Sequence, residues 1–354
     1  MDAPYPTENR NIDPPFSLDN FASLAIADRR PYFETVADRM NTLPAIVEKD
    51  FWVVWILKHL YALPDAPPFI FKGGTSLSKA FGLIDRFSED IDLIIDRAFF
   101  GYEGEKDISA ASSATAARKR MAGLDGDIAQ YIVERLLPAL KERFNGVLTA
   151  PFRFEPDADR TQNILFYYPT DSSHAYVQPM VLIEAGGNAD SWPTVERSIR
   201  PYVAEHVTAA FLSPDVVVKT IDAPRTFWEK LTILHKTAYR FDGEPDWEPA
   251  YRYSRHYYDV YRLSRAGILD AALADAELIK SVRDAAQTFF GDRKAKYEEF
   301  VAGSIRVIPS DHGIAALRRD YEAMRDMVFG VYPTFDEILD ELQRIDTIVN
   351  ARKP

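Results

Sequence analysis

The chain of 354 residues contains no cysteine and only six histidines. Without cysteine, it can form neither a disulfide framework nor a thiolate metal site. The histidines show no His-x-x-x-His pair or other zinc spacing, and no Gly-x-Ser-x-Gly nucleophile elbow occurs. The sequence therefore disfavours zinc chemistry and serine-nucleophile chemistry.

Long apolar segments are also missing. The apolar run 51–57 is followed by Lys58 and His59, far short of the roughly 20 apolar residues that a membrane span needs. No cationic segment followed by an apolar run resembles a secretory signal. We therefore expect a cytoplasmic protein that has no membrane span.

Positive charge is scarce, because 42 Lys and Arg stand against 54 Asp and Glu and give a formal net charge of −12. A general nucleic-acid coat protein usually has an overall basic face that neutralises phosphates. Any nucleic acid must therefore meet a local basic patch. The candidates are Arg118, Lys119 and Arg120, and the C-terminal cations Arg293, Lys294, Lys296, Arg318 and Arg319.

The sequence predicts an α+β protein in three parts. Hydrophobic residues make up 47% of the chain, enough for a well-buried core in one large domain or two ordinary ones. The proline-rich start has little periodicity, and we expect an N-terminal arm over 1–40. Strand and helix patterns alternate over 41–205, whereas the patterns from about 226 onward are almost entirely helical. The expected parts are the arm, an α+β core over 41–205 and a helical C-terminal domain over 206–354.

Within the core, large apolar residues recur at three- and four-residue intervals from Leu43 until Pro64, which predicts a buried helix. Further predicted elements are strands at 68–71 and 91–95, a short helix between them, a helix over about 125–143, and strands near 151–155, 162–168, 177–185 and 196–203. The Gly/Ser/Ala-rich segment 98–123 is expected to be a mobile loop with a basic tip at Arg118, Lys119 and Arg120.

Two aspartates carry the clearest chemical signal. Asp90 and Asp92 stand two apart at the start of a predicted strand, so both side chains should point to one face while Ile91 and Leu93 point to the other. Carboxylates held this close repel each other unless a cation lies between them, and an all-oxygen site suits Mg²⁺. The spacing alone favours the alternative, two solvated acids at a strand end, since Asp-x-Asp is common.

A glycine pair upstream strengthens the first interpretation. Gly73 and Gly74 follow a strand and precede a helix, so the backbone can turn sharply and present N–H groups, with the Thr75 and Ser76 hydroxyls, to a phosphate. An ordinary glycine turn with a helix cap is the alternative. The Walker pattern and the dinucleotide Gly-x-Gly-x-x-Gly pattern are both missing. Lys72, Lys79 and Arg86 surround this turn and could neutralise phosphate, although solvent exposure is the default for each.

The combination of glycine pair, short helix and Asp-x-Asp strand resembles the signature of the polymerase-β-like nucleotidyltransferases. The longer string FKGGTSLSKAFGLIDRFSEDIDLII closely resembles the AbiEii/AbiGii family of nucleotidyltransferase-like toxins, which includes the mycobacterial MenT toxins. Further similar segments are VEKDFWVVWIL, TFWEKLTIL and RHYYDVYRL, so the resemblance spans roughly 43–265. It implies a polymerase-β-like core whose active site is completed by the helical C-terminal domain.

The resemblance also implies roles for single residues. Lys230 would contact the phosphates of an NTP, and Asp259 would be the second essential acid. Glu184, at the end of an apolar strand, would be a third carboxylate that activates the attacking hydroxyl. The alternatives are a solvated helix lysine, an ordinary helix ion pair between Arg255 and Asp259, and a surface glutamate.

The expected activity is Mg²⁺-dependent transfer of nucleotides from an NTP to RNA by a toxin that a cognate antitoxin restrains. Asp90 and Asp92 would hold the metal, and the RNA acceptor would be the tRNA 3′ end. One alternative is a transferase of the same fold that modifies a protein or small-molecule hydroxyl, which the acidic charge mildly favours. The other is a nucleotide-binding regulator without catalysis, which the presence of both aspartates and the lysine argues against.

Overall fold

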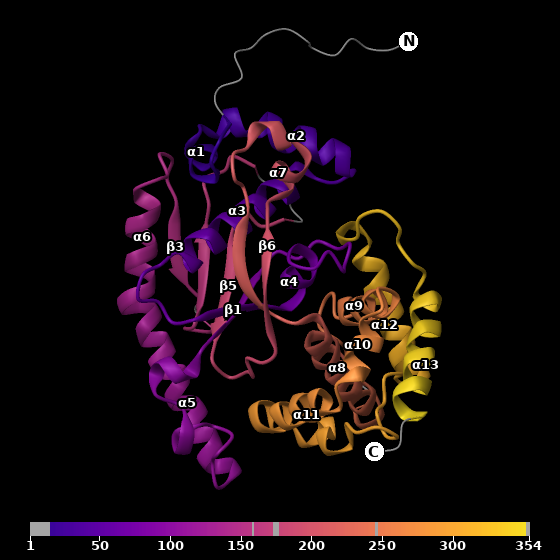
Figure 1. Cartoon of the computed structure of the whole chain (residues 1–354). Coiled ribbons are helices and arrows are strands. Elements are labelled where there is room, and N and C mark those ends of the chain that lie inside the picture. Colours follow the sequence, from indigo (N-terminus) through magenta and orange to yellow (C-terminus); the bar gives the residue numbers. More distant parts are fainter. Residues whose placement is uncertain (1–14, 158, 173–176, 245–246, 352–354) are drawn as a thin grey trace, which may run out of the picture.

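A mixed seven-stranded sheet forms the centre of the molecule (Figure 1). The computed structural model describes residues 15–157, 159–172, 177–244 and 247–351. The strand order is β3-β4-β5-β2-β1-β7-β6, in which the pairs β2–β5 and β1–β7 are parallel and the other pairs antiparallel. The strands are β1 (Phe69–Lys72), β2 (Ile91–Ile95), β3 (Arg153–Pro156), β4 (Asn163–Tyr167), β5 (Val181–Gly186), β6 (Thr194–Ile199) and β7 (Val216–Ile221). The predicted α+β class is confirmed, and β7 is a strand that the sequence patterns did not predict.

The predicted helix before the glycine turn is α3 (Pro44–Tyr61), and nearly all of its residues are buried. Pro44 occupies its first turn, where the fixed φ of proline suits a helix and no N–H is lost from the ladder. The helix packs against β5 and β7 and against α6 (Leu137–Asn145). Its indoles and the inward side chains of the sheet form one hydrophobic cluster, which holds the strands of the site in place.

Two helices precede α3, namely α1 (Leu18–Ser23) and α2 (Ile26–Met40). Leu18, Phe21 and Phe33 are buried in the same cluster as α3. The first fourteen residues of the predicted N-terminal arm lie outside the described residues, so the three-part division of the chain stays a prediction.

The expectation of a loop over 98–123 is wrong. This segment contains the short 3₁₀ turns η1 (Arg97–Phe100) and η2 (Gly104–Lys106), and then the first half of α5 (Ala114–Tyr131). Ser113 caps α5, because its Oγ accepts a hydrogen bond from the Ala116 N–H. Alanine favours helix strongly, so the Ala-rich run continues α5 instead of forming a loop. A π-helical turn, η3 (Ile132–Leu136), joins α5 to α6.

The second half of the chain is helical, as predicted, and its helices gather beside the sheet (Figure 1). After α7 (Tyr202–His206) and η4 (Thr208–Ala210), the helices are α8 (Ala223–Gly243), α9 (Arg255–Arg265), α10 (Ile268–Ala274), α11 (Ala276–Phe290), α12 (Asp311–Ala323) and α13 (Phe335–Ala351), with short turns η5 (Arg293–Ala295), η6 (Tyr297–Glu299) and η7 (Arg325–Met327). None of the helices in the described ranges is long and apolar enough to cross a membrane.

The two halves are joined next to the glycine turn. Leu77, on α4 (Gly73–Lys79), and Ile84 pack into the hydrophobic cluster of the C-terminal helices. The Phe87 N–H donates to the Met327 carbonyl and the Phe329 N–H donates to the Asp85 carbonyl, both at 2.7 Å. The polar connection between α4 and β2 is therefore fixed on the C-terminal half, which brings α8 and α9 up to the ends of β1 and β2.

Candidate active site

Three neighbouring strands bring two acids and a lysine into one row. In the sheet register Lys72 on β1 lies opposite Asp92 on β2, and Asp92 lies opposite Glu184 on β5. Ile91 and Leu93, which alternate with Asp90 and Asp92, are buried in the core cluster with α3. The aspartates therefore lie on the other side of the strand, and Asp90, Asp92 and Glu184 line one pocket of about 230 Å³.

The three carboxylates of this pocket interact unfavourably when all are charged. Burial raises the pKa of Asp90 to about 6, and the neighbouring Glu89 adds to the effect. Burial and the adjacent Asp92 raise the pKa of Glu184 to about 7. Asp92 lies opposite Glu184 in the sheet register, so its negative charge makes ionisation of Glu184 less favourable.

This donor set fits a divalent cation. In the described part of the chain no group of three or more His, Cys, Asp or Glu side chains has the geometry of a metal site. The pair Asp90 and Asp92 nevertheless supplies the one or two carboxylates with which Mg²⁺ is usually held beside substrate phosphates. A cation between these carboxylates and Glu184 would offset the repulsion that adds to the effect of burial on the pKa values of Asp90 and Glu184. The residues present therefore fit the predicted metal.

The glycine pair is required by close packing against the acids. Gly73 has a φ of +78°, and a Cβ there would overlap the Asp92 carboxylate. A Cβ on Gly74 would lie 2.6 Å from Nη2 of Arg86 and 2.7 Å from Oγ of Ser88. The backbone of the turn therefore forms part of the pocket wall directly beside the carboxylates.

Thr75 and Ser76, which the sequence predicts to bind phosphate, lie behind the wall of the pocket. Both residues are buried, and neither lines the pocket. The Thr75 hydroxyl hydrogen-bonds the Asp90 carbonyl at 2.6 Å and Ser88 Oγ at 2.9 Å, and the Ser76 hydroxyl donates to the Gly73 carbonyl at 3.0 Å. Their hydroxyls fix the turn and the start of β2, whereas Ser88, which the sequence analysis overlooked, lines the pocket.

Asp259 on α9 is fully buried beneath the pocket, between two cations. It accepts hydrogen bonds from Nε and Nη2 of Arg86 at 2.7 and 2.8 Å, and its other ion pair is with Nζ of Lys230 at 2.7 Å. Burial by itself raises the pKa of Asp259, but Arg86 and Lys230 outweigh it and hold this pKa well below the usual range. The alternative interpretation of Asp259, a helix ion pair with Arg255, is therefore wrong. The partners of Asp259 are Lys230 and Arg86, and Arg86 lies 173 positions earlier in the chain.

Two lysines differ from their expected surroundings. Lys230, on α8, lines the pocket but is only 7% exposed, so the description of it as a solvated helix lysine is wrong. Burial lowers the pKa of Lys230, against the attraction of Asp259. Lys79 does not line the pocket; it is buried against Asp50, with Nζ 3.0 Å from Oδ1. Arg86 is likewise buried, so solvent exposure holds for neither Lys79 nor Arg86.

Arg255 is a functional candidate that the sequence analysis considered only as an ion-pair partner. It is exposed and lines the pocket with Lys72 and Lys230. Among the described residues no acid lies within ion-pair distance of Arg255, so its charge is available to an anion. His256, the next residue, also lines the pocket, and burial with the nearby cations lowers its pKa well below the ordinary value.

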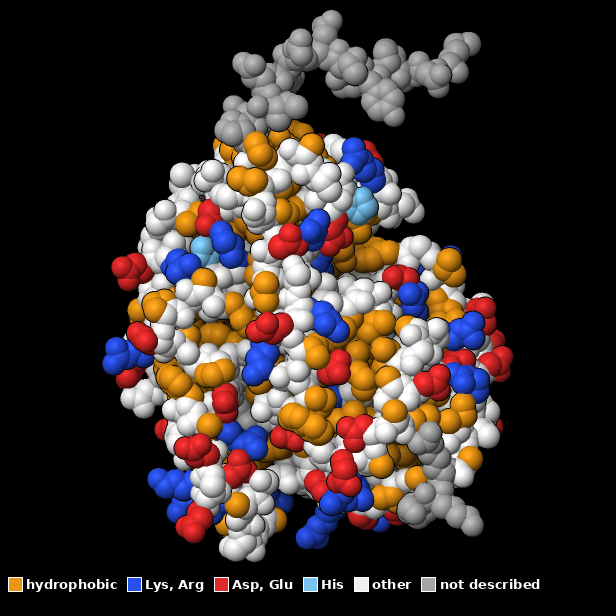
Figure 2. Space-filling model, in the orientation of Figure 1, with side chains coloured by type: hydrophobic (Ala, Val, Ile, Leu, Met, Phe, Trp, Pro, Cys, Tyr) orange, Lys and Arg blue, Asp and Glu red, His pale blue; other side chains and the backbone are white. Residues whose placement is uncertain are grey.

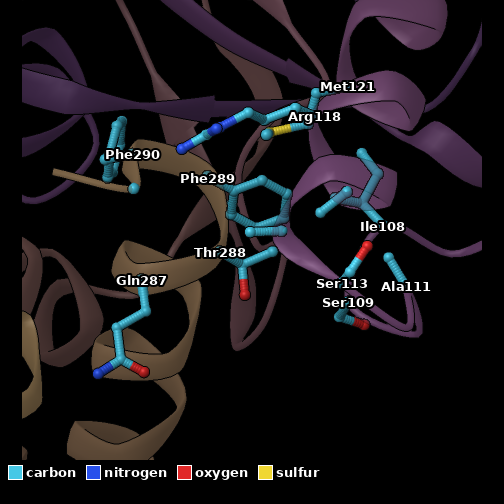
Figure 3. A pocket seen from close by; sticks show the side chains of 13 residues that line it. Ile108, Ser109, Ala111, Ser113, Arg118, Met121, Gln287, Thr288, Phe289 and Phe290 are labelled. Carbon is cyan, nitrogen blue, oxygen red and sulfur yellow. The ribbon is translucent and has the colours of Figure 1, made fainter. Parts of the chain in front are cut away.

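The predicted basic residues 118–120 lie on α5 near a second pocket of about 380 Å³ (Figure 3). Figure 3 shows the Arg118 side chain extending across this pocket toward the end of α11, where Phe289 and Phe290 lie. Lys119 is exposed, and Arg120 donates to the Asp107 carbonyl. Of the C-terminal cations, Lys294, Lys296, Arg318 and Arg319 form ion pairs with acids.

Basic and acidic side chains are interspersed over the face of the molecule in Figure 2, and no large area of one sign is visible. Lys and Arg side chains gather at the lower left, where α5 lies. Any nucleic acid must therefore bind a local patch, as the net charge requires.

A glycine turn against paired strand carboxylates, faced by a lysine and an arginine from a helical half, defines a nucleotidyltransferase type of site. Residues 55–341 match the family model described as "Nucleotidyl transferase AbiEii toxin, Type IV TA system". The protein belongs to this family. It is therefore an NTP-dependent nucleotidyltransferase toxin of a type IV toxin–antitoxin system, and the family implies a cognate antitoxin.

The family match reaches further into the C-terminal helices than the predicted resemblance over 43–265. Seven chains of solved structures also match. One is MenT4, a nucleotidyltransferase toxin from Mycobacterium tuberculosis H37Rv, with 15% sequence identity, a TM-score of 0.48, and coverage of 91% of this chain and 90% of that chain. No curated protein matches the chain.

Proposed function

We propose that the protein transfers nucleotides from an NTP to RNA, at the 3′ end of tRNA, with Mg²⁺ held by Asp90 and Asp92. The observation that carries the proposal is the pocket in which these two carboxylates and Glu184 meet Lys72, Lys230 and Arg255. Cations facing clustered acids suit a bound metal–triphosphate complex, because the carboxylates neutralise the metal ion and the cations neutralise the phosphate oxygens.

The pocket residues divide into two binding roles. The backbone of Gly73 and Gly74 lets the triphosphate approach closely, while Lys72, Lys230 and Arg255 supply positive charge to its oxygens. Mg²⁺ bound by the aspartates would supply charge stabilisation for the phosphoryl oxygens and the departing pyrophosphate. Asp259 and Arg86 have a positioning role. Asp259 forms buried ion pairs with both Arg86 and Lys230, and these pairs hold the Lys230 side chain in place.

Glu184 is the proposed proton acceptor. The oxygen of the acceptor hydroxyl forms a bond to the α-phosphorus while the bond from that phosphorus to pyrophosphate breaks. The hydroxyl proton passes to Glu184, a carboxylate that lies opposite Asp92 and lines the same pocket. Pyrophosphate leaves with the electrons of the broken bond.

The RNA acceptor is supported by the pocket between α5 and α11. It combines a cation, Arg118, with the aromatic rings of Phe289 and Phe290 (Figure 3). Single-stranded nucleic acids bind to proteins by this combination, because bases stack on aromatic side chains while cations contact the phosphates. Lys119 on the same helix is exposed and adds a second charge.

The test is to incubate the protein with Mg²⁺, each α-labelled NTP in turn and total tRNA, and to separate the products by gel. We expect label in tRNA and none when EDTA is present. Label in a protein band instead would favour the alternative acceptor. Binding of NTP without transfer to any acceptor would leave the non-catalytic regulator as the better interpretation.

A further inference from the structure

Another cavity, larger than the pocket that contains Asp90 and Asp92, adjoins that catalytic pocket. Its volume is about 440 Å³, within the range of small-ligand sites. It lies between α8 and α11 and shares the wall residues Lys72, Glu229, Ile233 and His256 with the catalytic pocket. We call it the α8–α11 cleft. A ligand longer than a triphosphate can therefore extend from one cavity into the other.

The linings of the two cavities differ in chemistry. The lining of the catalytic pocket contains charged and small side chains but no Phe, Tyr or Trp. The α8–α11 cleft is lined by Trp247, Tyr253, Phe289 and Phe290. Phosphates and a metal thus fit the first cavity, and a flat aromatic ring fits the second.

Apart from Lys72, which the α8–α11 cleft shares with the catalytic pocket, the lysines and arginines of its lining are already paired with acids. Nζ of Lys236 lies 3.1 Å from Asp292, and Nε of Arg240 lies 3.1 Å from Glu244. Arg225 pairs with Glu229 at 2.9 Å. A phosphodiester backbone needs free cations, so this cleft suits an uncharged group. Beyond Phe289 and Phe290 the α5–α11 pocket begins, where Arg118 has no acidic partner among the described residues (Figure 3).

Two residues in the cleft wall also carry an unpaired polar atom. Oδ1 of Asn188 and Nδ1 of His256 are buried, and neither has a hydrogen-bond partner within the part of the chain that the structure describes. Buried polar atoms without a partner are rare in proteins.

We propose that the α8–α11 cleft is the subsite for the nucleoside of the donor NTP. The base lies against the aromatic side chains, and the triphosphate reaches past His256 and Glu229 to the carboxylates. This assignment rests on the proposed function of the catalytic pocket. It leaves the α5–α11 pocket to the acceptor.

The test compares the binding of two probes by calorimetry in Mg²⁺: inorganic tripolyphosphate and non-hydrolysable α,β-methylene NTPs. The variant Trp247→Ala removes a half-buried ring that lines the α8–α11 cleft but not the α5–α11 pocket. Its affinity for the NTP analogue should fall about 5- to 150-fold, the range for loss of one base–aromatic stack, while tripolyphosphate affinity is unchanged. The matched control is Phe99→Ala, which removes a ring that is 47% exposed on η1 and should change neither affinity.

A second variant, Ala285→Trp, fills the α8–α11 cleft without touching the α5–α11 pocket. It should likewise weaken the NTP analogue alone, with circular dichroism as the check on folding. Unchanged NTP-analogue affinity in both folded variants, or a loss of RNA affinity in place of NTP affinity, would overturn the assignment. If the wild-type protein binds neither probe, the proposed function fails together with this subsite.

Discussion

The buried charges beneath the pocket allow a sharp stability prediction for Asp259→Asn. The side chain of Asp259 is 0% exposed, and those of Arg86 and Lys230 are 4% and 8% exposed. Replacing the carboxylate by an amide leaves two buried cations without a counter-charge. Breaking a buried ion pair in this way typically costs about 3–5 kcal/mol, because the remaining charge is no longer compensated. We therefore expect Asp259→Asn to lose about that much of its free energy of unfolding.

A matched control is available at the surface. Asp215 accepts hydrogen bonds from Arg200 with both carboxylate oxygens, yet the two side chains are 44% and 41% exposed. Because water screens exposed pairs, Asp215→Asn should cost less than about 1 kcal/mol.

The measurement is urea-induced unfolding followed by circular dichroism for the wild type and both variants. A free energy of unfolding for Asp259→Asn that equals that of Asp215→Asn would show that Arg86 and Lys230 are adequately solvated without the carboxylate.

Three further predictions concern the pocket and its surroundings. Lys230→Ala should lower the free energy of NTP binding, measured by calorimetry, more than it lowers the free energy of unfolding, because Asp259 keeps both hydrogen bonds from Arg86. Equal NTP affinities of the wild type and the variant would show that Lys230 does not contact the NTP. Gly73→Ala should reduce both the melting temperature and nucleotide transfer, since its Cβ overlaps Asp92 at a φ of +78°, and a variant with wild-type values would contradict the close approach. Replacing residues 118–120 together by Ala should flatten the salt dependence of tRNA binding, by about 0.7–0.9 in log K against log salt per lost contact, and leave NTP affinity unchanged. An unchanged slope would show that these cations contact no phosphate.

Local patterns predicted the parts of the site that lie within one short stretch of chain. Period-two alternation placed Ile91 and Leu93 in the core and Asp90 and Asp92 on the other face. The spacing of large apolar residues gave α3, because that helix is buried on nearly all sides. Both signals depend on neighbours in sequence, which a single chain displays directly.

The contacts across the chain could not be read in this way. Asp259 finds Arg86 through the docking of the α4–β2 connection on the C-terminal helices, and no local spacing reports it. Side chains four residues apart on a helix often form ion pairs, which suggests Arg255 as the partner of Asp259. Arg255 lines the pocket instead. The segment 98–123 resembles a loop because it contains several glycines and serines. The alanines after Ser113 favour helix more strongly, and α5 begins there.

The substitution Asp92→Asn shows whether the carboxylates of Asp90 and Asp92 serve a metal-dependent transfer. The measurement is label transferred from an α-labelled NTP to tRNA in Mg²⁺, together with the free energy of unfolding of the same protein. Removing one of two repelling carboxylates should leave stability unchanged or raise it, since the charge of Asp92 no longer raises the pKa of the adjacent Glu184. We expect a stably folded variant without detectable transfer. Wild-type transfer by a folded Asp92→Asn protein would contradict it.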